Sequence, residues 1–293
     1  MSGLITWAAR NWADKGTVTA VYGADTGTMD PSYPVTNLQN RQLARIARYL
    51  SGGSGVFATA DLGAAMPVKL VGMFGIGALQ LVPYSGANIY EIQVQGSNVS
   101  NFSSLVYNNT TGSISARQGS LWLRNHAFWI LPTVVSARYW RVRVQGYSPK
   151  AFRDVGRLWI SDALDLTGAI DTDPVLGGVD PGVLLESYGQ QYYEQPRQRI
   201  RTISLGLKLT TQQAFGFSDT SAAQVNAASL QALQVEAGTT GEVFVVTYAR
   251  NRTWAQATSA YGHLSSFPEI QRHPDSAPDS PRYSSTINVA EEG

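Results

Sequence analysis

The chain has 293 residues, of which 15% are charged and 10% aromatic, and its formal net charge is +1. This balance gives no electrostatic basis for binding nucleic acid, which as a rule requires a basic domain. The sequence contains no cysteine, which excludes disulfides and thiolate metal sites. Few charges together with many aromatic residues and 28 glycines suit an all-β protein whose surface is partly covered by neighbours.

The N-terminal half predicts a series of short strands. A short helix is expected over Gln39–Gln42, with Thr36 as its cap, and turn residues rich in Gly, Ser and Pro separate the other elements. The predicted strands are Thr17–Tyr22, Val56–Leu62, Val68–Ile76, Tyr90–Ser97, Leu121–Leu131, Val134–Val144 and Val155–Ile160.

Two of these strands alternate strictly between apolar and polar residues and stop at the same Val-Gln-Gly tripeptide. Such alternation is typical of half-buried antiparallel strands. The polar row of the first strand consists of Glu91, Gln93 and Gln95 and is expected to be solvated. The corresponding row of the second consists of Tyr139, Arg141 and Arg143. This aromatic and basic row is where we expect a partner protein to make contact.

The composition changes in the middle of the chain, where residues 164–182 are rich in Asp, Gly and Pro and predict a linker. Beyond it we expect a strand at Arg199–Leu209, a helix at Thr220–Ala237 that stops at Gly238, and strands at Glu242–Tyr248 and Tyr283–Val289. The sequence therefore predicts two domains, 1–163 and 183–293, joined by this linker.

No spacing in the sequence nominates a catalytic or cofactor site. The histidines His126, His263 and His273 do not stand at metal-ligand spacing from one another. The stretch Asp171–Asp173 begins like a calcium loop but lacks the later ligands and the closing glutamate. We therefore predict no catalytic residue, no metal and no cofactor, and a protein that is not an enzyme.

Two groups of basic residues are candidates for contact with a partner. Arginine and tyrosine together are the mixture found at protein–protein hot spots, and the neutral chain argues against nucleic acid as the partner. The candidate contact residues are Tyr139, Arg141, Arg143, Arg197, Arg199 and Arg201.

Six motifs in the N-terminal half follow one another in a familiar order. They are YPVTNLQ at Tyr33–Gln39, ATADLG at Ala58–Gly63, VKLVGMFGIG at Val68–Gly77, YEIQVQGS at Tyr90–Ser97, RYWRVRV at Arg138–Val144 and VGRLWI at Val155–Ile160. This order resembles the galactose-binding-like jelly roll of the discoidin, F5/8 type C kind. The resemblance implies a jelly-roll β-sandwich. The family's sugar-binding residues match no position of this sequence, so sugar binding is not implied.

The C-terminal half is similar to minor tail and baseplate proteins of tailed bacteriophages, including distal-tail-like proteins. The matching segments are Arg199–Leu209, Gly238–Val246, Tyr261–Leu264 and Tyr283–Val289. This similarity implies a β-sandwich or split barrel of tail-tip type that assembles into rings of three-fold or six-fold symmetry.

Together these observations predict an all-β protein with one or two short helices, acting as a structural component of a phage virion. It would form part of the tail tip or baseplate and dock other baseplate or fibre proteins. The N-terminus lacks the pattern of a signal peptide and no apolar run is long enough to insert into a membrane, so we expect assembly in the host cytoplasm. The alternative is a carbohydrate-binding module that contacts a host surface glycan.

Overall fold

The structure is a computed structural model. It describes residues 4–20, 29–50, 55–76, 91–109, 126–145, 152–167, 170–179, 183–186, 192–195, 200–210, 214–215, 229–238, 240–247, 258–266, 269–272 and 282–291. Several sequence predictions fall wholly or partly outside these residues. The main ones are the first half of the strand at Leu121–Leu131, the first half of the helix at Thr220–Ala237, and the contact residues Arg197 and Arg199.

The chain forms two compact units, and the second is inserted into the sequence of the first. Unit 1 comprises Met1–Ala9 and Leu164–Gly293, and unit 2 comprises Arg10–Ala163. Strand β1 (Leu4–Ala8) pairs with β10 (Leu164–Thr167), so the chain leaves unit 1 and returns to it on neighbouring strands. The predicted division put residues 1–163 into one domain. This predicted division differs from the observed one because β1 pairs with strands far along the chain, and no local sequence pattern predicts such a pairing.

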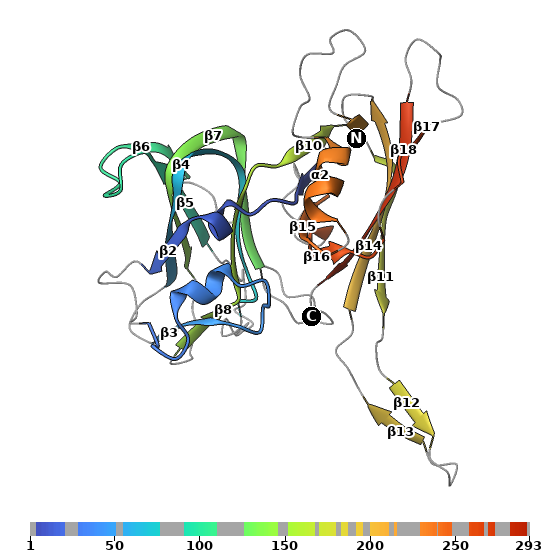
Figure 1. The fold of residues 1–293 in the computed structure, drawn as a ribbon, viewed down its shortest axis with the longest axis horizontal. Helices are drawn as coiled ribbons and strands as arrows, with labels where there is room; N and C mark the ends of the chain where they lie inside the picture. The colour runs from blue at the N-terminus through green and yellow to red at the C-terminus, as the bar shows by residue number, and fades with distance from the viewer. Residues whose placement is uncertain are drawn as a thin grey trace, which may run out of the picture. The chain divides into compact units, whose positions relative to one another are not determined.

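Unit 2 is an antiparallel β-sandwich, shown in blue to green in Figure 1. Its larger sheet has the order β2-β4-β7-β5-β6, with β9 paired to β4, and β3 and β8 form a second, two-stranded sheet. The strands are β2 (Thr17–Ala20), β3 (Ala47–Leu50), β4 (Gly55–Phe74), β5 (Glu91–Ser97), β6 (Leu105–Asn108), β7 (His126–Gln145), β8 (Phe152–Val155) and β9 (Arg157–Ser161). Two 3-10 helices, η1 (Trp12–Lys15) and η2 (Val35–Gln39), complete the unit.

Strands β4 and β7 are longer than the sequence predicts, because each joins two predicted strands into one of 20 residues. Their pairing shifts register between Asp61 and Met66 and again between Val68 and Leu70. The turn residues that predicted a chain break therefore bend the strand instead of ending it, as β-bulges do. The helix expected at Gln39–Gln42 is also displaced: η2 begins directly after Pro34 and ends at Gln39.

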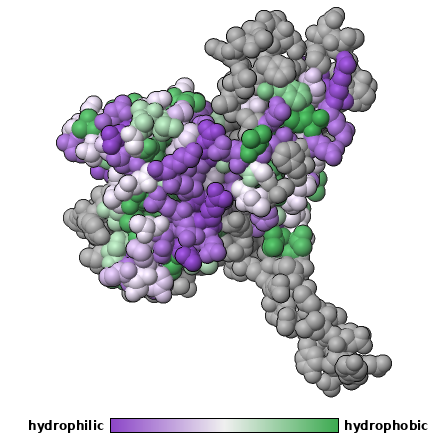
Figure 2. Space-filling model, in the orientation of Figure 1, coloured by the Kyte–Doolittle hydropathy of each residue, from purple (hydrophilic) through white to green (hydrophobic). Residues whose placement is uncertain are grey.

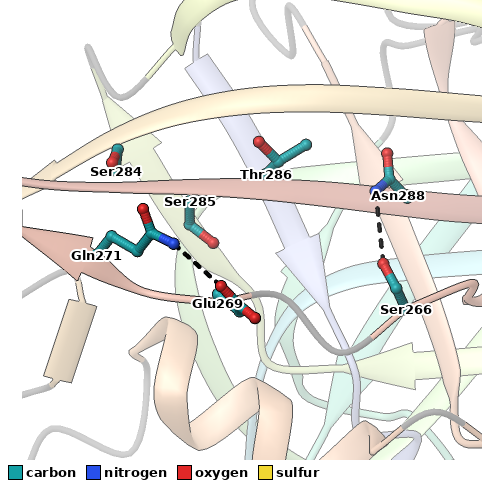
Figure 3. A pocket seen from close by; sticks show the side chains of 7 residues that line it. All are labelled: Ser266, Glu269, Gln271, Ser284, Ser285, Thr286 and Asn288. Atoms are coloured by element: carbon teal, nitrogen blue, oxygen red, sulfur yellow. Dashed lines mark hydrogen bonds between the residues drawn. The ribbon is translucent and has the colours of Figure 1, made fainter.

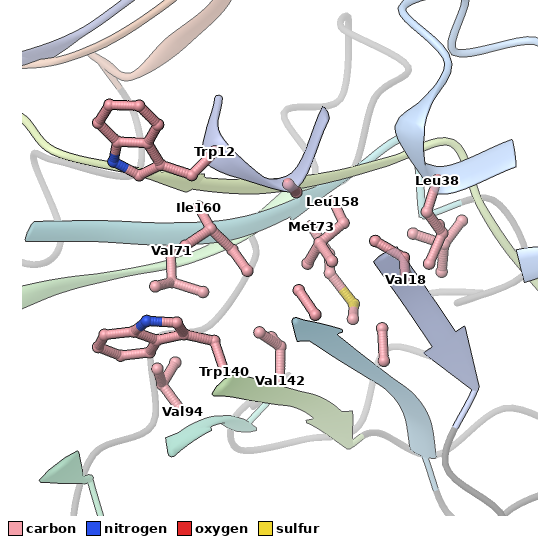
Figure 4. Packing of buried hydrophobic residues seen from close by; sticks show 14 of the residues in the cluster. Trp12, Val18, Leu38, Val71, Met73, Val94, Trp140, Val142, Leu158 and Ile160 are labelled. Carbon is pink, nitrogen blue, oxygen red and sulfur yellow. The ribbon is translucent and has the colours of Figure 1, made fainter. Parts of the chain in front are cut away.

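The two halves of these long strands enclose the core of unit 2 (Figure 4). Trp140 and Val142 from one half of β7 belong to the same buried cluster as Val71 and Met73 from the far half of β4. Gly96 lies opposite Trp140, and a Cβ atom at this glycine would come within 3.1 Å of the indole ring. The glycine of the first Val-Gln-Gly motif thus leaves space for the tryptophan of the second strand.

The two strands that end in Val-Gln-Gly are direct neighbours. Val94 on β5 lies opposite Val142 on β7, and Gln95 lies opposite Arg141. Their polar rows, which the sequence analysis treated as separate surfaces, therefore form one continuous face of the sheet.

Unit 1 is built on an eight-stranded antiparallel sheet of order β10-β1-β15-β16-β18-β14-β11, with β17 paired to β18. Beyond β1 and β10, its strands are β11 (Ile170–Val179), β14 (Ile200–Thr210), β15 (Glu242–Val246), β16 (Ala260–Leu264), β17 (Gln271–Arg272) and β18 (Arg282–Glu291). A separate hairpin consists of β12 (Val183–Glu186) and β13 (Tyr192–Gln195). Helix α2 (Leu230–Ala237) contributes Leu230 and Ala237 to the same buried cluster as the sheet.

The predicted linker at 164–182 contains two strands of this sheet, β10 and β11. Both lie at edges of the sheet, where Asp, Gly and Pro are tolerated because one side of the strand has no hydrogen-bonding neighbour. Pro174 lies within the second register shift of β11, between Thr172 and Val175, so the ladder accommodates its missing N–H. Polar composition therefore marked edge strands and not a linker.

Other predictions for unit 1 are confirmed. The clean alternation at Arg199–Leu209 corresponds to β14, in which every second residue is buried. Helix α2 ends at Ala237, and Gly238 follows it with a φ of 55°, which a glycine adopts without strain. The all-β fold class, with few helical residues, is confirmed for the described chain.

Candidate binding surface

The Asp61-Leu62-Gly63 motif positions the first charged pair on the outer face of unit 2. The Asp61 carboxylate accepts a hydrogen bond of 2.9 Å from the N–H of Gly63, whose φ is 78°. The same carboxylate forms a two-pronged ion pair with Arg138, at 2.7 Å to Nε and 2.9 Å to Nη2. The hydrogen bonds from Arg138 lower the pKa of Asp61, burial opposes this shift, and the Gly63 N–H adds to it.

Arg138 also orders the aromatic ring beside it. Its guanidinium carbon lies 4.9 Å from the ring centroid of Tyr139, and its backbone N–H donates to Oδ1 of Asn98 at 3.1 Å. Tyr139 is half-buried and lies opposite Asp61 in the ladder. A carboxylate, a guanidinium group and an aromatic ring are thus held side by side.

Arg141 lies one step further along β7 and is held differently. Both Nε and Nη2 donate to Oε1 of Gln95, at 2.8 and 2.6 Å. Its guanidinium carbon lies 4.5 Å from the ring centroid of Phe102. In the described part of the chain no carboxylate pairs with this cation, and partial burial lowers its pKa.

The turn between β5 and β6 places Phe102 over this arginine. Ser97 Oγ donates to the carbonyl oxygens of Val99 and Ser104, at 2.9 and 2.7 Å. Phe102 itself adopts a φ of 56°, a conformation that costs free energy for a side chain of this size. The apolar side chains of Val99, Leu105 and Val106 nearby in the sequence are exposed.

We call this arrangement the β7 surface and define it by Asp61, Gln95, Phe102, Arg138, Tyr139 and Arg141. It contains two of the predicted contact residues, Tyr139 and Arg141. On the side of the molecule drawn in Figure 2, hydrophilic residues cover much of the described surface of unit 2 and hydrophobic residues form separate patches.

Of the other predicted contact residues, the structure describes Arg143 and Arg201. Arg143 is half-buried and lies opposite Gln93, in the same face as Arg141. Arg201 is only 9% exposed and pairs with Glu291 and with the carbonyl oxygen of Ser259, all within unit 1. This arginine therefore serves the packing of its own unit. Arg197 and Arg199 lie outside the described residues.

Sequence reasoning missed Asp61, Gln95, Phe102 and Arg138 as members of the surface. A usable signal was present, because an aspartate two residues before a glycine often closes a tight turn through its side chain. The contribution of Phe102 had no local signal, since only the folding of the β5–β6 turn brings it to Arg141.

Within the described stretches, no group of three or more His, Asp and Glu side chains is placed to bind a metal ion. The same stretches contain no helix with the length and apolar character needed to cross a bilayer.

No protein-family model matches the sequence, and no curated protein matches it. Several solved structures are similar in fold. They include CpGH89CBM32-6 produced by Clostridium perfringens, with 13% identity, 52% of this chain and 99% of that chain covered, and a TM-score of 0.34. Chitosan-binding module 1 from a chitosanase/glucanase of Paenibacillus sp. IK-5 is 17% identical, and the match covers 52% of this chain and 99% of that chain with a TM-score of 0.35. A GH29 fucosidase of Ruminococcus gnavus in complex with fucose is 14% identical, and the match covers 53% of this chain and 27% of that chain with a TM-score of 0.37.

At these TM-scores the likeness does not bear on what this chain binds. The named neighbours are carbohydrate-binding modules and a glycosidase, and a place in a phage tail stays a prediction.

Proposed function

We propose that the chain is a glycan-binding protein without catalytic activity, and that the β7 surface binds a saccharide with a carboxylate group. The observation behind this proposal is Arg141, a partly buried guanidinium group whose hydrogen-bond partner is the neutral amide of Gln95. Burying a charge is costly unless a counter-charge joins it, and guanidinium groups pair with carboxylates through two parallel hydrogen bonds.

The neighbouring groups match the rest of a sugar ring. Aromatic faces pack against apolar ring surfaces, and planar amide, guanidinium and carboxylate groups exchange hydrogen bonds with hydroxyl groups. The rings of Tyr139 and Phe102 supply the first kind of contact, and the Asp61–Arg138 pair supplies the second. Because cross-strand hydrogen bonds already hold Arg138 on Asp61 and Arg141 on Gln95, little conformational entropy of these side chains is lost on binding.

The test is a glycan array that holds neutral and uronic-acid oligosaccharides, followed by calorimetry on the full chain with the best ligand. We expect Arg141→Gln to weaken binding about ten- to hundredfold, the effect of losing a charge-assisted hydrogen bond. Arg45→Gln, at an exposed arginine of the same unit, is the matched control and should leave affinity unchanged.

A chemical control uses the methyl ester of the same uronic acid, which keeps the ring and removes the charge. The ester should bind the wild-type chain as weakly as the acid binds Arg141→Gln. Binding of acid and ester with equal affinity would refute the role of the carboxylate. An array without any ligand would refute the function.

A second candidate function is assembly with further copies or with other tail proteins, as the sequence predicts for the C-terminal half. It is favoured by β11, an edge strand of unit 1 on which Val175, Leu176 and Val179 are exposed. An open strand edge with apolar side chains is a template for pairing with another chain. Light scattering on the purified chain should then find three-fold or six-fold assemblies that Leu176→Lys dissociates. A wild-type chain that remains monomeric at high concentration would exclude self-assembly.

A further inference from the structure

Strand β18 of unit 1 has an open stretch along one edge. On that edge β16 pairs as far as Leu264 opposite Val289, and β17 pairs at Gln271 opposite Ser284. On this edge no described strand pairs with residues 285–288, whereas their other edge pairs with β14. Ser265 closes the β16 end, since its N–H and Oγ donate to the carbonyl oxygen of Asn288 at 2.9 and 3.0 Å.

A pocket of about 370 Å³ lies at this opening (Figure 3). The described side chains that line it are polar: four hydroxyl groups, two amides and one carboxylate. They belong to Ser266, Glu269, Gln271, Ser284, Ser285, Thr286 and Asn288. None of these described side chains carries a positive charge. The volume lies at the lower end of the range for small-molecule sites.

Ser285 is the feature of the pocket that packing within the chain does not explain. It is only 5% exposed, and its hydroxyl group has no hydrogen-bond partner. It shares the inward face of β18 with Ile287 and Val289, which belong to the buried apolar cluster of unit 1, and with Tyr283, which packs against that cluster. A buried hydroxyl without a partner costs free energy, so such groups in folded proteins call for an explanation. A ligand in the pocket supplies one.

The backbone of β18 offers further polar groups at the same place. Asn288 directs its carbonyl oxygen to Ser265, away from β14. Antiparallel strands alternate in this respect, so the N–H and C=O of Thr286 also point away from β14 and towards the opening. The open stretch of four residues is about 13 Å long. Because β16 and β17 close both ends, the opening admits a compact molecule and not an added strand.

The charge of the lining narrows the class of ligand. The described lining offers no cation to pair with a phosphate or a carboxylate, and burying an unpaired anion is costly. Glu269 is hydrogen-bonded through Oε2 to Nε2 of Gln271 at 3.0 Å. Its carboxylate is an acceptor only, whereas the serine, threonine and amide groups both donate and accept. Such a set of partners fits a molecule that is neutral and rich in hydroxyl groups.

We infer that this pocket is a second ligand site and that it binds a neutral monosaccharide or a similar small polyol. The site lies in unit 1 and shares no residue with the β7 surface, for which the proposed ligand is acidic. The ligand accepts or donates a hydrogen bond at Ser285 Oγ, uses the open backbone of Thr286, and donates a hydroxyl proton to Glu269.

The test uses the full chain and saturation-transfer NMR with glucose, galactose, mannose and N-acetylglucosamine. We expect saturable binding of at least one of these sugars to the wild-type chain. Ser285→Ala and Glu269→Gln should each weaken it at least tenfold. Thr19→Ala removes an exposed hydroxyl from unit 2 and should leave the affinity unchanged, as should Arg141→Gln on the β7 surface.

Thermal unfolding without ligand gives an independent readout. Ser285→Ala should melt at a higher temperature than the wild-type chain, because the substitution removes a buried hydroxyl that has no partner. A lower melting temperature would mean that the hydroxyl serves the fold, and would overturn the inference.

Three binding results would also overturn it. They are no saturable binding of any of the four sugars, equal affinity in both pocket variants, and binding of inorganic phosphate as tight as that of the sugars. Loss of sugar binding in Arg141→Gln alone would refute the pocket and leave the glycan-binding function of unit 2 in place.

Discussion

Two arginines of unit 2 are held in opposite ways. Arg157 is fully buried, and both of its terminal nitrogens donate to the carboxylate of Asp14 at 2.7 Å. Arg141 is half-buried, and its partners are the neutral Gln95 and the ring of Phe102. The first cation has its counter-charge within the chain, whereas no described carboxylate pairs with the second. The comparison shows that the partner of an arginine is more informative than its burial. An arginine paired with a carboxylate of its own chain stabilises the fold, whereas one held by a neutral amide is available to bind an anionic ligand.

The difference between the two arginines is tested most directly by removing the hydrogen-bond partner of each in turn. Asp14→Ala removes the carboxylate that accepts two hydrogen bonds from the buried Arg157 guanidinium. We expect this to lower the free energy of unfolding by about 3–5 kcal/mol, as for other broken buried pairs. Chemical denaturation of unit 2, followed by tryptophan fluorescence, measures the loss.

The matched variant is Gln95→Ala, which takes the hydrogen-bond partner from Arg141. Because water reaches this half-buried side chain, we expect a loss of about 1 kcal/mol or less. Equal losses in the two variants would show that the arginines do not differ in role.

The smallest effect concerns the pH dependence of the Asp61–Arg138 pair. The pKa of Asp61 is lowered in the folded chain, mainly by the hydrogen bonds from Arg138. Its contribution to stability is therefore present above the ordinary aspartate pKa of about 3.9 and is lost as the pH falls through the lower, folded value. Solvent screening keeps this contribution small, since the two side chains are 33% and 43% exposed.

Melting temperatures of the wild-type chain and Asp61→Asn, measured from pH 7 to pH 2.5, check this prediction. The wild-type chain should be the more stable of the two at neutral pH, and the two curves should meet below about pH 4. A difference that persists at pH 2.5 would mean that Asp61 acts through packing or neutral hydrogen bonds and not through its charge.

The candidate site was predictable only in part. Tyr139 and Arg141 stand out in the sequence because they alternate with buried residues on a clear strand. Their surroundings do not, since Gln95, Asp61 and Phe102 come from other strands and from a turn. The sequence contains one signal of the pocket in unit 1: Ser285 interrupts the row that Tyr283, Ile287 and Val289 form on β18. Its meaning appears only once β16 and β17 are seen to leave that edge open.

By itself the sequence determined the antiparallel β class, the alternation of β5, β7, β14 and β18, and the end of helix α2 at Gly238. These features depend on residues two to four positions apart, which the local chain specifies. The tertiary structure alone decided that β1 belongs with β10 and β15, that the stretch 164–182 contains the edge strands β10 and β11, and which arginine meets a carboxylate. Pairings between distant segments depend on how the whole chain buries its apolar faces, and no short stretch of sequence contains that information.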